Sequence, residues 1–314
     1  MAQQANHPLP RGFQLEEYTI ERQLSLGGFS IVYLARDAKG DQVAIKEYLP
    51  NSLALRGRGE YKPHIPTEYQ GTFRYGMKCF FEEGRALAKL SHPNVVRVLN
   101  FFRANDTVYM VMAYEHGRTL HEVIQGQPGR LSERFLRGLF ARLLNGLREV
   151  HAHKLLHLDL KPANIYLRTD NTPVLIDFGA ARQTLTTDQP MLKPMYTPGF
   201  ASPEHYGARK DIGPWSDIYS IGASLYACLG GQAPQAADER LKKDLLVPAM
   251  ARWEGEYSDR LLEIIDWTLN LNHLYRPQSV FALQKAIVEP PKPRPPKVTE
   301  TWIGRFVGKF RNSA

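Results

Sequence analysis

The stretch His157-Leu-Asp-Leu-Lys-Pro-Ala-Asn164 decides which fold and chemistry to expect of this 314-residue chain. It supplies a carboxylate at Asp159, an ammonium at Lys161 and an amide at Asn164. Thirteen residues after Asn164 comes a second motif, Asp177-Phe-Gly179. A carboxylate can accept a proton, and carboxylate and amide oxygens are ligands that Mg²⁺ prefers. The two motifs together therefore indicate a catalytic site that binds a divalent cation.

These residues fit the needs of phosphoryl transfer. The reaction requires a triphosphate held in place, its charge neutralised by Mg²⁺ and Lys, and an incoming hydroxyl aligned near a base. We expect Asp159 to orient the hydroxyl and accept its proton, and Lys161 to steady the transferring phosphoryl group. Asn164 and Asp177 are the predicted Mg²⁺ ligands.

A lysine that could hold the phosphates lies upstream, at the end of the predicted strand Val43-Ala-Ile-Lys46. A lysine in this place is often only a strand-end charge. Glu83, on the helix predicted over Lys78–Leu90, would make it a functional pair by fixing the ammonium while Lys46 holds the α- and β-phosphates. Glu82 is the neighbouring alternative.

The stretch Ser25-Leu-Gly-Gly-Phe-Ser-Ile-Val32 lies between two predicted strands. Against the pattern G-x-G-x-x-G-x-V it keeps Gly27 and replaces the other two glycines by Ser25 and Ser30. A plain hairpin turn is therefore the structural alternative. The nucleotide-binding residues predicted around this loop and the strands beside it are Leu24, Gly27, Gly28, Phe29, Val32, Ala44 and Lys46.

With these motifs the chain resembles the eukaryotic-type serine/threonine protein kinases, most closely their bacterial members in Gly-Gly-Phe-Ser and Lys46-Glu-Tyr-Leu-Pro50. The similarity covers Tyr18 to Val288. It implies an α+β, bilobal protein-kinase-like fold with a small antiparallel β lobe and a larger helical lobe. It also implies ATP and Mg²⁺ as cofactors and serine or threonine hydroxyls of proteins as substrates.

The resemblance assigns roles to further residues. Kinases place the lysine-pairing glutamate nine residues before the position of His92, which favours Glu83 over Glu82, although the spacing from Lys46 is unusually long. The adenine site is implied at Met112, Ala113, Glu115 and Tyr166. Lys161 and Thr197 match the serine/threonine class. The stabilising groups implied are a Glu204–Arg276 pair, Asp217 as an anchor of the catalytic loop, and His157 and Phe178 as core.

One position departs from the family. The arginine that usually precedes the catalytic aspartate is Leu158 here. That arginine normally gathers a phosphorylated residue of the activation loop. Phosphate on Thr184, Thr186 or Thr187 would therefore lack its usual receiver.

The chain divides into three parts. Residues 1–17 read as a loose lead-in, and 18–288 as the kinase domain, with a small lobe over 18–112 and a large lobe over 117–288. Residues 51–76 contain Gly57, Gly59, Pro63, Pro66 and Gly71 with weak periodicity, and predict an irregular insertion. Residues 289–314 read as a proline-rich spacer and a basic amphipathic tail.

The expected strands are Tyr18–Leu24, Ser30–Ala35, Gln42–Lys46, Val95–Arg103 and Thr107–Tyr114. After Gly117 helical periodicity dominates, with Ser132 as a predicted N-cap and Trp215–Leu229 as a buried central helix. Further amphipathic helices are expected over Leu261–Asn270 and Ser279–Val288.

The net charge of +8 first suggests a nucleic-acid partner, but the position of the charge argues against one. Residues 290–314 carry +5, which leaves about +3 for the rest of the chain. No apolar run is long enough to cross a membrane, and no secretory signal is visible. The two cysteines, Cys79 and Cys228, indicate buried thiols in a reducing cytoplasm.

The tail offers a possible docking element. On a helical wheel Trp302, Ile303, Phe306, Val307 and Phe310 share one face, away from three cations. Protein docking is the preferred interpretation because five large apolar side chains are costly to leave in water. A frayed terminus and adsorption to an anionic membrane are the alternatives.

Two other functions remain open. A pseudokinase, acting as a scaffold or nucleotide-binding module, is suggested by Ser25 and Ser30 alone. A small-molecule phosphotransferase would share the same cleft, although Lys161 and the Thr197–Glu204 segment favour a peptide substrate.

Overall fold

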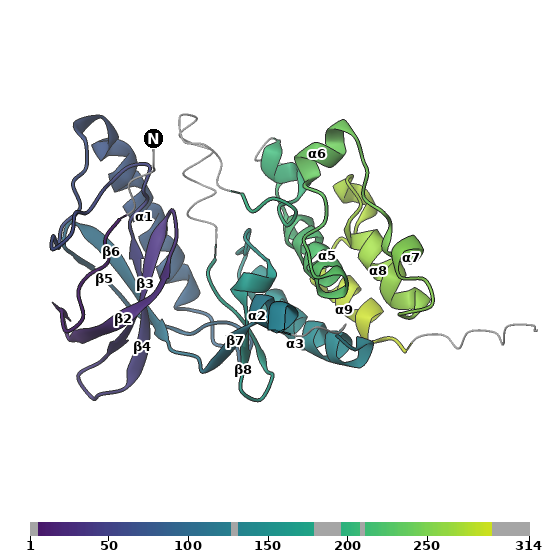
Figure 1. Cartoon of the computed structure of the whole chain (residues 1–314), viewed down its shortest axis with the longest axis horizontal. Coiled ribbons are helices and arrows are strands. Elements are labelled where there is room, and N and C mark those ends of the chain that lie inside the picture. The colour runs from purple at the N-terminus through teal and green to yellow at the C-terminus, as the bar shows by residue number, and fades with distance from the viewer. Residues whose placement is uncertain (1–5, 127–130, 179–195, 208–210, 291–314) are drawn as a thin grey trace, which may run out of the picture.

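The computed structural model describes residues 6–126, 131–178, 196–207 and 211–290. Two lobes lie side by side, a sheet with one long helix on the left of Figure 1 and a mostly helical lobe on the right. The chain passes between them after residue 113. Among the described ranges, no helix has both the length and the apolar character that a membrane crossing requires.

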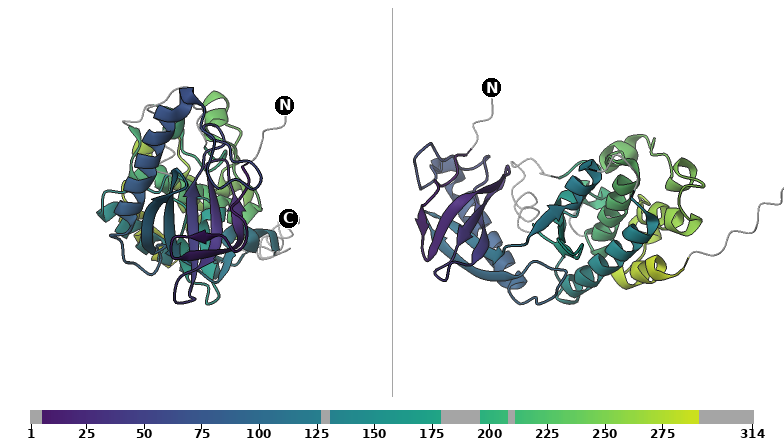
Figure 2. Two further views of the ribbon diagram at one scale, coloured as in Figure 1. Left: turned by 90° about the vertical axis from the view of Figure 1, so that its left-hand side faces the viewer. Right: turned by 60° about the horizontal axis from the view of Figure 1, so that its bottom comes forward.

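The small lobe is a six-stranded sheet in the order β1-β2-β3-β4-β6-β5, and every pair in it is antiparallel. Its helix α1 lies along one face of the sheet and contacts β5 and β6 (Figure 2). The strands are β1 (Gln14–Leu15), β2 (Tyr18–Leu26), β3 (Ser30–Arg36), β4 (Gln42–Tyr48), β5 (Val98–Ala104) and β6 (Thr107–Ala113), and the helix is α1 (Gln70–Leu87).

The large lobe is organised around α5 (Pro214–Gly230), whose residues from Ser216 to Leu229 are all buried. This confirms the predicted central helix. At Gly222 the neighbouring helix comes so close that an added Cβ would lie 2.0 Å from Thr268 Oγ1. Ser132 caps the long amphipathic helix that follows it, because its Oγ accepts from Phe135 N at 3.3 Å as predicted.

The other helices of this lobe are α2 (Leu120–Gly126), α3 (Glu133–Ala152), α6 (Ala237–Lys242), α7 (Ala249–Arg252), α8 (Asp259–Thr268) and α9 (Val280–Val288). A small sheet of β7 (Gly117–Thr119), β8 (Ile165–Arg168) and β9 (Pro173–Leu175) lies at the junction with the small lobe. The catalytic loop lies between α3 and β8.

Three predictions about the small lobe are wrong. The lead-in is not loose from residue 6 onward, since Asn6, Leu9 and Leu15 are 2–3% exposed and β1 pairs with β2. The insertion is not irregular to residue 76, because α1 already begins at Gln70. The expected strand over Val95–Arg103 also begins later, at Val98.

A buried ion pair joins the end of the activation segment to the connection between α8 and α9. Arg276 donates to both oxygens of Glu204, at 2.8 and 3.1 Å, and its side chain is fully buried. Burial alone would raise the pKa of Glu204, but the hydrogen bonds and charge of Arg276 outweigh it and hold the pKa below its ordinary value. The predicted pairing is confirmed.

We expect Arg276→Met to lower the free energy of unfolding by about 3–5 kcal/mol, because the Glu204 carboxylate would stay buried without its cation. Urea unfolding measures this. The matched control is Arg260→Met: Arg260 pairs with Glu289 at 2.9 Å, but the two side chains are 35% and 48% exposed. That variant should lose less than about 1 kcal/mol. Equal losses in the two variants would contradict the assignment.

The same pair has a predicted pH dependence. Because the folded-state pKa of Glu204 lies below the unfolded value, its contribution is complete above the unfolded pKa, at about 4.3. The contribution is lost as the pH falls through the lower, folded-state value. Urea midpoints measured from pH 7 to pH 3 should therefore fall more steeply for the wild type than for Glu204→Gln/Arg276→Met.

Candidate active site

The catalytic motif folds into one hydrogen-bonded cluster. Lys161 Nζ lies 3.0 and 3.2 Å from the two carboxylate oxygens of Asp159. Lys161 also donates to Thr197 Oγ1 at 2.9 Å, and that hydroxyl donates to Asp159 Oδ1 at 3.1 Å. Asn164 Nδ2 donates to Asp159 Oδ2 at 2.9 Å and to its main-chain oxygen at 2.8 Å. Asp159 is therefore oriented from three sides.

Asp177 lies next to this cluster and carries the charge that faces Lys46. Asn164 Nδ2 reaches the main-chain oxygen of Asp177 at 3.4 Å, while Asp177 Oδ1 lies 2.6 Å from Lys46 Nζ. The φ of Asp177 is +59°, a conformation that non-glycine residues seldom adopt. Such strain persists only where the surroundings enforce it, and it concentrates at functional sites.

The predicted ion pair between Lys46 and Glu83 is not formed between these two described residues. Lys46 pairs with Asp177 instead and lies over the ring of Phe80, 5.5 Å from its centroid. The choice of Glu83 over Glu82 agrees with the helix register, because Glu83 is 9% exposed whereas Glu82 faces outward beside Arg85. The sequence thus predicted the inward face of α1 but not which acid holds the lysine.

The carboxylate of Asp217, on α5, accepts hydrogen bonds from the main chain of the catalytic loop. Its Oδ1 accepts from Leu158 N at 2.8 Å, and its Oδ2 accepts from His157 N at 2.9 Å and His151 Nε2 at 2.8 Å. Burial would raise the pKa of Asp217, but the bond from His151 and its other donors hold it below the ordinary value. The predicted anchoring role is confirmed. The two main-chain bonds hold the loop where Leu158 adopts a left-handed conformation, with φ +60°.

Sequence reasoning missed His151, which lies in the last turn of α3. Nothing in its spacing from the motif singled it out, since a histidine at a helix end is usually a capping charge. Its role depends on α3 and α5 meeting, which only the packing of the large lobe reveals.

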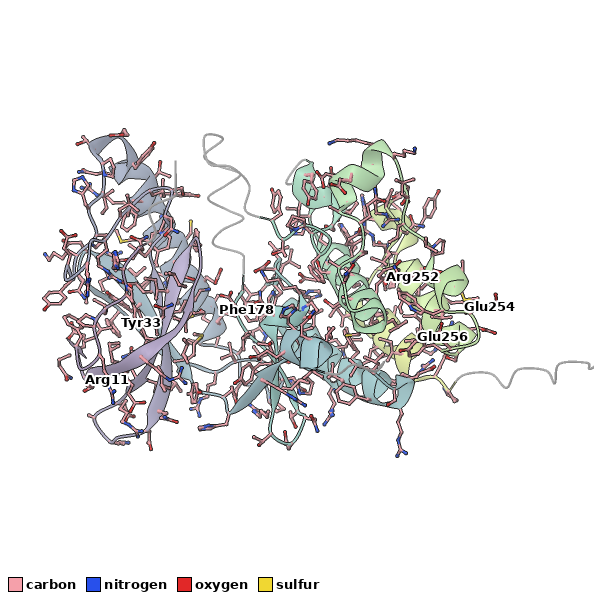
Figure 3. All side chains as sticks on the ribbon, in the orientation of Figure 1. Arg11, Tyr33, Phe178, Arg252, Glu254 and Glu256 are labelled. Atoms are coloured by element: carbon pink, nitrogen blue, oxygen red, sulfur yellow. The ribbon has the colours of Figure 1, made fainter. Side chains whose placement is uncertain are left out.

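His157 and Phe178 pack as predicted. Their rings stack with centroids 4.3 Å apart, and the two residues are 0% and 4% exposed. Burial lowers the pKa of His157, so the ring is held neutral and serves as core. Phe178 lies where the sheet lobe meets the helical lobe (Figure 3).

The predicted nucleotide-binding residues come from neighbouring strands. In the sheet register Val32 lies opposite Lys46, and Ala44 lies opposite Met112. Leu24 is half-buried on β2 near the bulge. Ala113 ends β6, and Tyr166 is half-buried on β8. The predicted set is thus drawn from both the small-lobe sheet and β8 of the large lobe.

Glu115 has a partner that the sequence did not indicate. Its carboxylate is bonded by Arg168 at 2.6 and 2.7 Å, across the connection between β6 and β7. This pair ties the connection to the large lobe, so only the main chain of Glu115 is left for the predicted contact with adenine. Gly179, the end of the second motif, lies outside the described residues, as do Thr184, Thr186 and Thr187.

The donor set fits Mg²⁺. Asn164 uses its Nδ2 as a donor to Asp159, which leaves Oδ1 as its acceptor. Asp177 contributes carboxylate oxygens and is 38% exposed, so it can reach a bound ion. Hard oxygen ligands of this kind, few in number and open to phosphate, are typical of Mg²⁺ sites.

Comparison with known proteins agrees with this geometry. Residues 18–288 match the family described as "Protein kinase domain". The chain belongs to the protein kinase family. Among solved structures, this kinase superposes on PpkA-294 in its apo form with a TM-score of 0.81 and 34% identity, over 89% of this chain and 99% of that one. The fold class is thereby confirmed.

A second structure, the PknI kinase domain of Mycobacterium tuberculosis, has 22% identity and a TM-score of 0.66 over 89% of this chain and 98% of that one, and shows the fold alone. Human Nek2 is 35% identical over 66% of this kinase and 49% of its own length. PLK4 of Drosophila yakuba is 28% identical over 78% of this kinase and 30% of its own length. The chain spans only about a third to a half of these two relatives.

We expect Thr197→Ala to lower kcat for phosphotransfer by about ten- to a hundredfold, because the hydroxyl that bridges Lys161 and Asp159 is lost. Thr197→Ser keeps the hydroxyl and should stay within about threefold of the wild type. Steady-state kinetics on a peptide substrate measures both. If the two variants lose activity equally, the bridge is not what orients Asp159.

Proposed function

We propose that this kinase transfers the γ-phosphate of Mg·ATP to serine or threonine hydroxyls of protein substrates. The single observation that carries the proposal is the complete cluster of Asp159, Lys161, Thr197 and Asn164, with Asp177 beside it. A phosphotransferase needs a base, a cation at the transferring group and ligands for the metal in one place. Here each of these groups is hydrogen-bonded to at least one other of them.

The residues act by positioning. Asp159 accepts the proton of the substrate hydroxyl, and its carboxylate is held in place by Lys161 and Asn164. Lys161 can turn from Thr197 toward the transferring phosphoryl group, where its charge offsets the negative charge that builds up. The buried anchor at Asp217 keeps the loop from shifting, which matters because small misplacements cost large factors in rate.

The phosphates would be held by Lys46, with Asn164 and Asp177 as ligands of Mg²⁺. Bound Mg²⁺ supplies charge neutralisation along the phosphates. Lys46 is only 5% exposed and lies 2.6 Å from Asp177, which supports holding the phosphates beside this pair. Glu83, on the inward face of α1, remains a predicted partner of Lys46 once nucleotide draws the lysine from Asp177.

Thr197 supports serine and threonine as acceptors. Its hydroxyl bridges Lys161 and Asp159 and so lies against the base that a substrate hydroxyl must approach. Protein substrates agree with the match to the protein kinase family and with the likeness to the serine/threonine-protein kinase Nek2. We further propose a cytoplasmic location, as the two cysteines suggested. Cys228 is buried as predicted, whereas Cys79 is only partly buried.

A pseudokinase scaffold or nucleotide-binding module is the second candidate, because the loop before Val32 keeps one of three glycines. The charges that catalysis requires are nevertheless all present and connected.

The tail from residue 291 onward lies outside the described residues, and protein docking of its aromatic face stays a proposal. Truncation after Val288 with measurement of melting temperature, activity and oligomeric state tests it.

Asp159→Asn and Asp177→Asn are each expected to lower phosphotransfer by at least about a thousandfold, because positioning and electrostatics supply nearly all of the rate. ATP affinity should fall less for Asp159→Asn, whose carboxylate is assigned to the hydroxyl rather than to the phosphates. Radiolabel transfer and nucleotide titration measure the two quantities. Near-normal turnover of Asp159→Asn would exclude Asp159 as the base.

Basal activity is expected without phosphate on the activation loop, because Leu158 cannot hold one. Replacing Thr184, Thr186 and Thr187 together by alanine should keep activity on an external substrate within about fivefold. Activity of the protein purified after phosphatase treatment provides the control. A triple variant that is folded but inactive would show that another cation, such as Arg182 or Lys193, receives the phosphate.

A further inference from the structure

The loop between β2 and β3, to which the proposed function assigns the phosphates, is bonded to the chain that follows β4. Leu49 N donates to Phe29 O at 3.0 Å, and Asn51 N donates to Gly28 O at 2.9 Å. The ring of Phe29 is 8% exposed and meets Tyr48 edge-on, with centroids 5.2 Å apart. The β3–β4 pairing thus continues past Ser30 and Tyr48 into the loop itself.

This tether uses carbonyl groups of the loop. Within the part of the chain that the structure describes, no acceptor is bonded to the N–H groups of Gly28 and Phe29. Backbone N–H groups in a turn are suitable donors to phosphate oxygens. The loop can therefore be held from one side while its donors stay available on the other.

The segment that bonds to the loop is itself fixed by one buried amide from the N-terminal segment. Asn6 is 2% exposed, and its Nδ2 donates to Asn51 Oδ1 at 2.7 Å, Ala54 O at 3.2 Å and Leu49 O at 3.3 Å. Its Oδ1 accepts from Arg56 N at 2.6 Å. A single side chain so joins both ends of the segment 49–56.

A buried ion pair fixes the other end of that segment. The guanidinium of Arg56 lies 2.6 and 2.7 Å from the two oxygens of Glu47, and the residues are 1% and 0% exposed. Glu47 follows Lys46 on β4, so the two side chains point to opposite faces of the sheet. The lysine strand, the insertion and the N-terminal segment are therefore one connected unit.

Two tyrosines complete the surroundings of this pair. Tyr33 and Tyr109 donate to Glu47 Oε2 and Oε1, each at 2.7 Å, and Arg56 also donates to Tyr33 at 2.8 Å. Burial raises the pKa of both phenols, so they remain protonated donors. Figure 3 shows Tyr33 within the sheet of the small lobe.

We infer that Asn6, Asn51 and Arg56 are positioning residues for the phosphate-binding loop. The loop lacks two of the glycines of the family pattern, and the bonded segment 49–56 holds its main chain in place from the β4 side. The inference rests on the proposed function, since it assigns the loop to ATP. The N-terminal segment and the insertion thereby acquire a role in nucleotide affinity beyond stability.

The test is Asn6→Ala in the full chain, with Mg·ATP as the probe. The dissociation constant measured by calorimetry, and KM for ATP, should rise about tenfold, the equivalent of one lost hydrogen bond. The value of kcat and KM for the peptide should stay within about threefold, because Asp159 and its neighbours are untouched. Amide hydrogen exchange of Leu49 and Asn51, the two donors to the loop, should become faster.

Asn51→Ala is the milder variant, because it removes one bond to Asn6 and keeps the main-chain donor to Gly28. Its affinity loss should be intermediate, and it serves the same test if Asn6→Ala does not fold.

Two controls separate positioning from stability. Asn100→Ala removes an amide bonded to Tyr18 in the same sheet, and Arg240→Met removes a 7% exposed arginine in the large lobe. Neither should change the dissociation constant.

If the wild type binds Mg·ATP and both Asn6→Ala and Asn51→Ala bind it equally tightly, the positioning role is overturned. The proposed function is unaffected by that result. A similar loss in Arg240→Met at equal melting temperature also overturns it, because general destabilisation then explains the effect. A wild-type protein that binds no Mg·ATP overturns the proposed function and this role with it. Weaker binding confined to these two variants, about tenfold for Asn6→Ala and less for Asn51→Ala, supports the role.

Discussion

The buried carboxylate of Asp217 is the constraint on which the site depends. It accepts the main-chain N–H groups of His157 and Leu158 and a ring N–H of His151, all from one fully buried position on α5. Left-handed backbone at Leu158 is strained, and three bonds to a buried charge compensate for the strain. With that turn held, Asp159 lies within reach of Lys161, Thr197 and Asn164.

Buried arginine–carboxylate pairs fix the segments on either side of this centre. Glu204–Arg276 secures the end of the activation segment on the large lobe, and Glu47–Arg56 secures the insertion on the lysine strand. Such pairs give little net stability, because the cost of burying two charges offsets their attraction. A conformation in which one partner is missing leaves a buried charge unpaired and costs free energy. Each pair therefore favours one position of its segment.

The charges of the cleft are arranged so that nucleotide can displace existing bonds. Lys46 pairs with Asp177 and Lys161 pairs with Asp159, so each cation already lies beside the carboxylate with which it would work. Mg·ATP would separate Lys46 from Asp177 while both stay in the site. Leu158 stands where the family usually has the arginine that receives activation-loop phosphate, so we propose that the site is assembled without that phosphate.

The sequence determined the broad architecture and the residues proposed for the reaction. Motif spacing singled out Asp159, Lys161, Asn164 and Asp177. Phosphoryl transfer restricts which residue types can act at such positions, and these four residues lie close together in the sequence. Alternation and helical periodicity predicted most elements, since these patterns report local burial. Partners distant in sequence were predicted only where the family resemblance supplied them, as for Glu204 with Arg276.

Tertiary structure alone decided the partners that no pattern encodes: Lys46 meets Asp177 rather than Glu83, and His151 meets Asp217. The lead-in and insertion looked unstructured because they lack periodicity, yet a single asparagine and a single arginine order them through buried hydrogen bonds. Periodicity records which face of an element is apolar, whereas a polar contact between distant segments depends on where the folded chain brings them together.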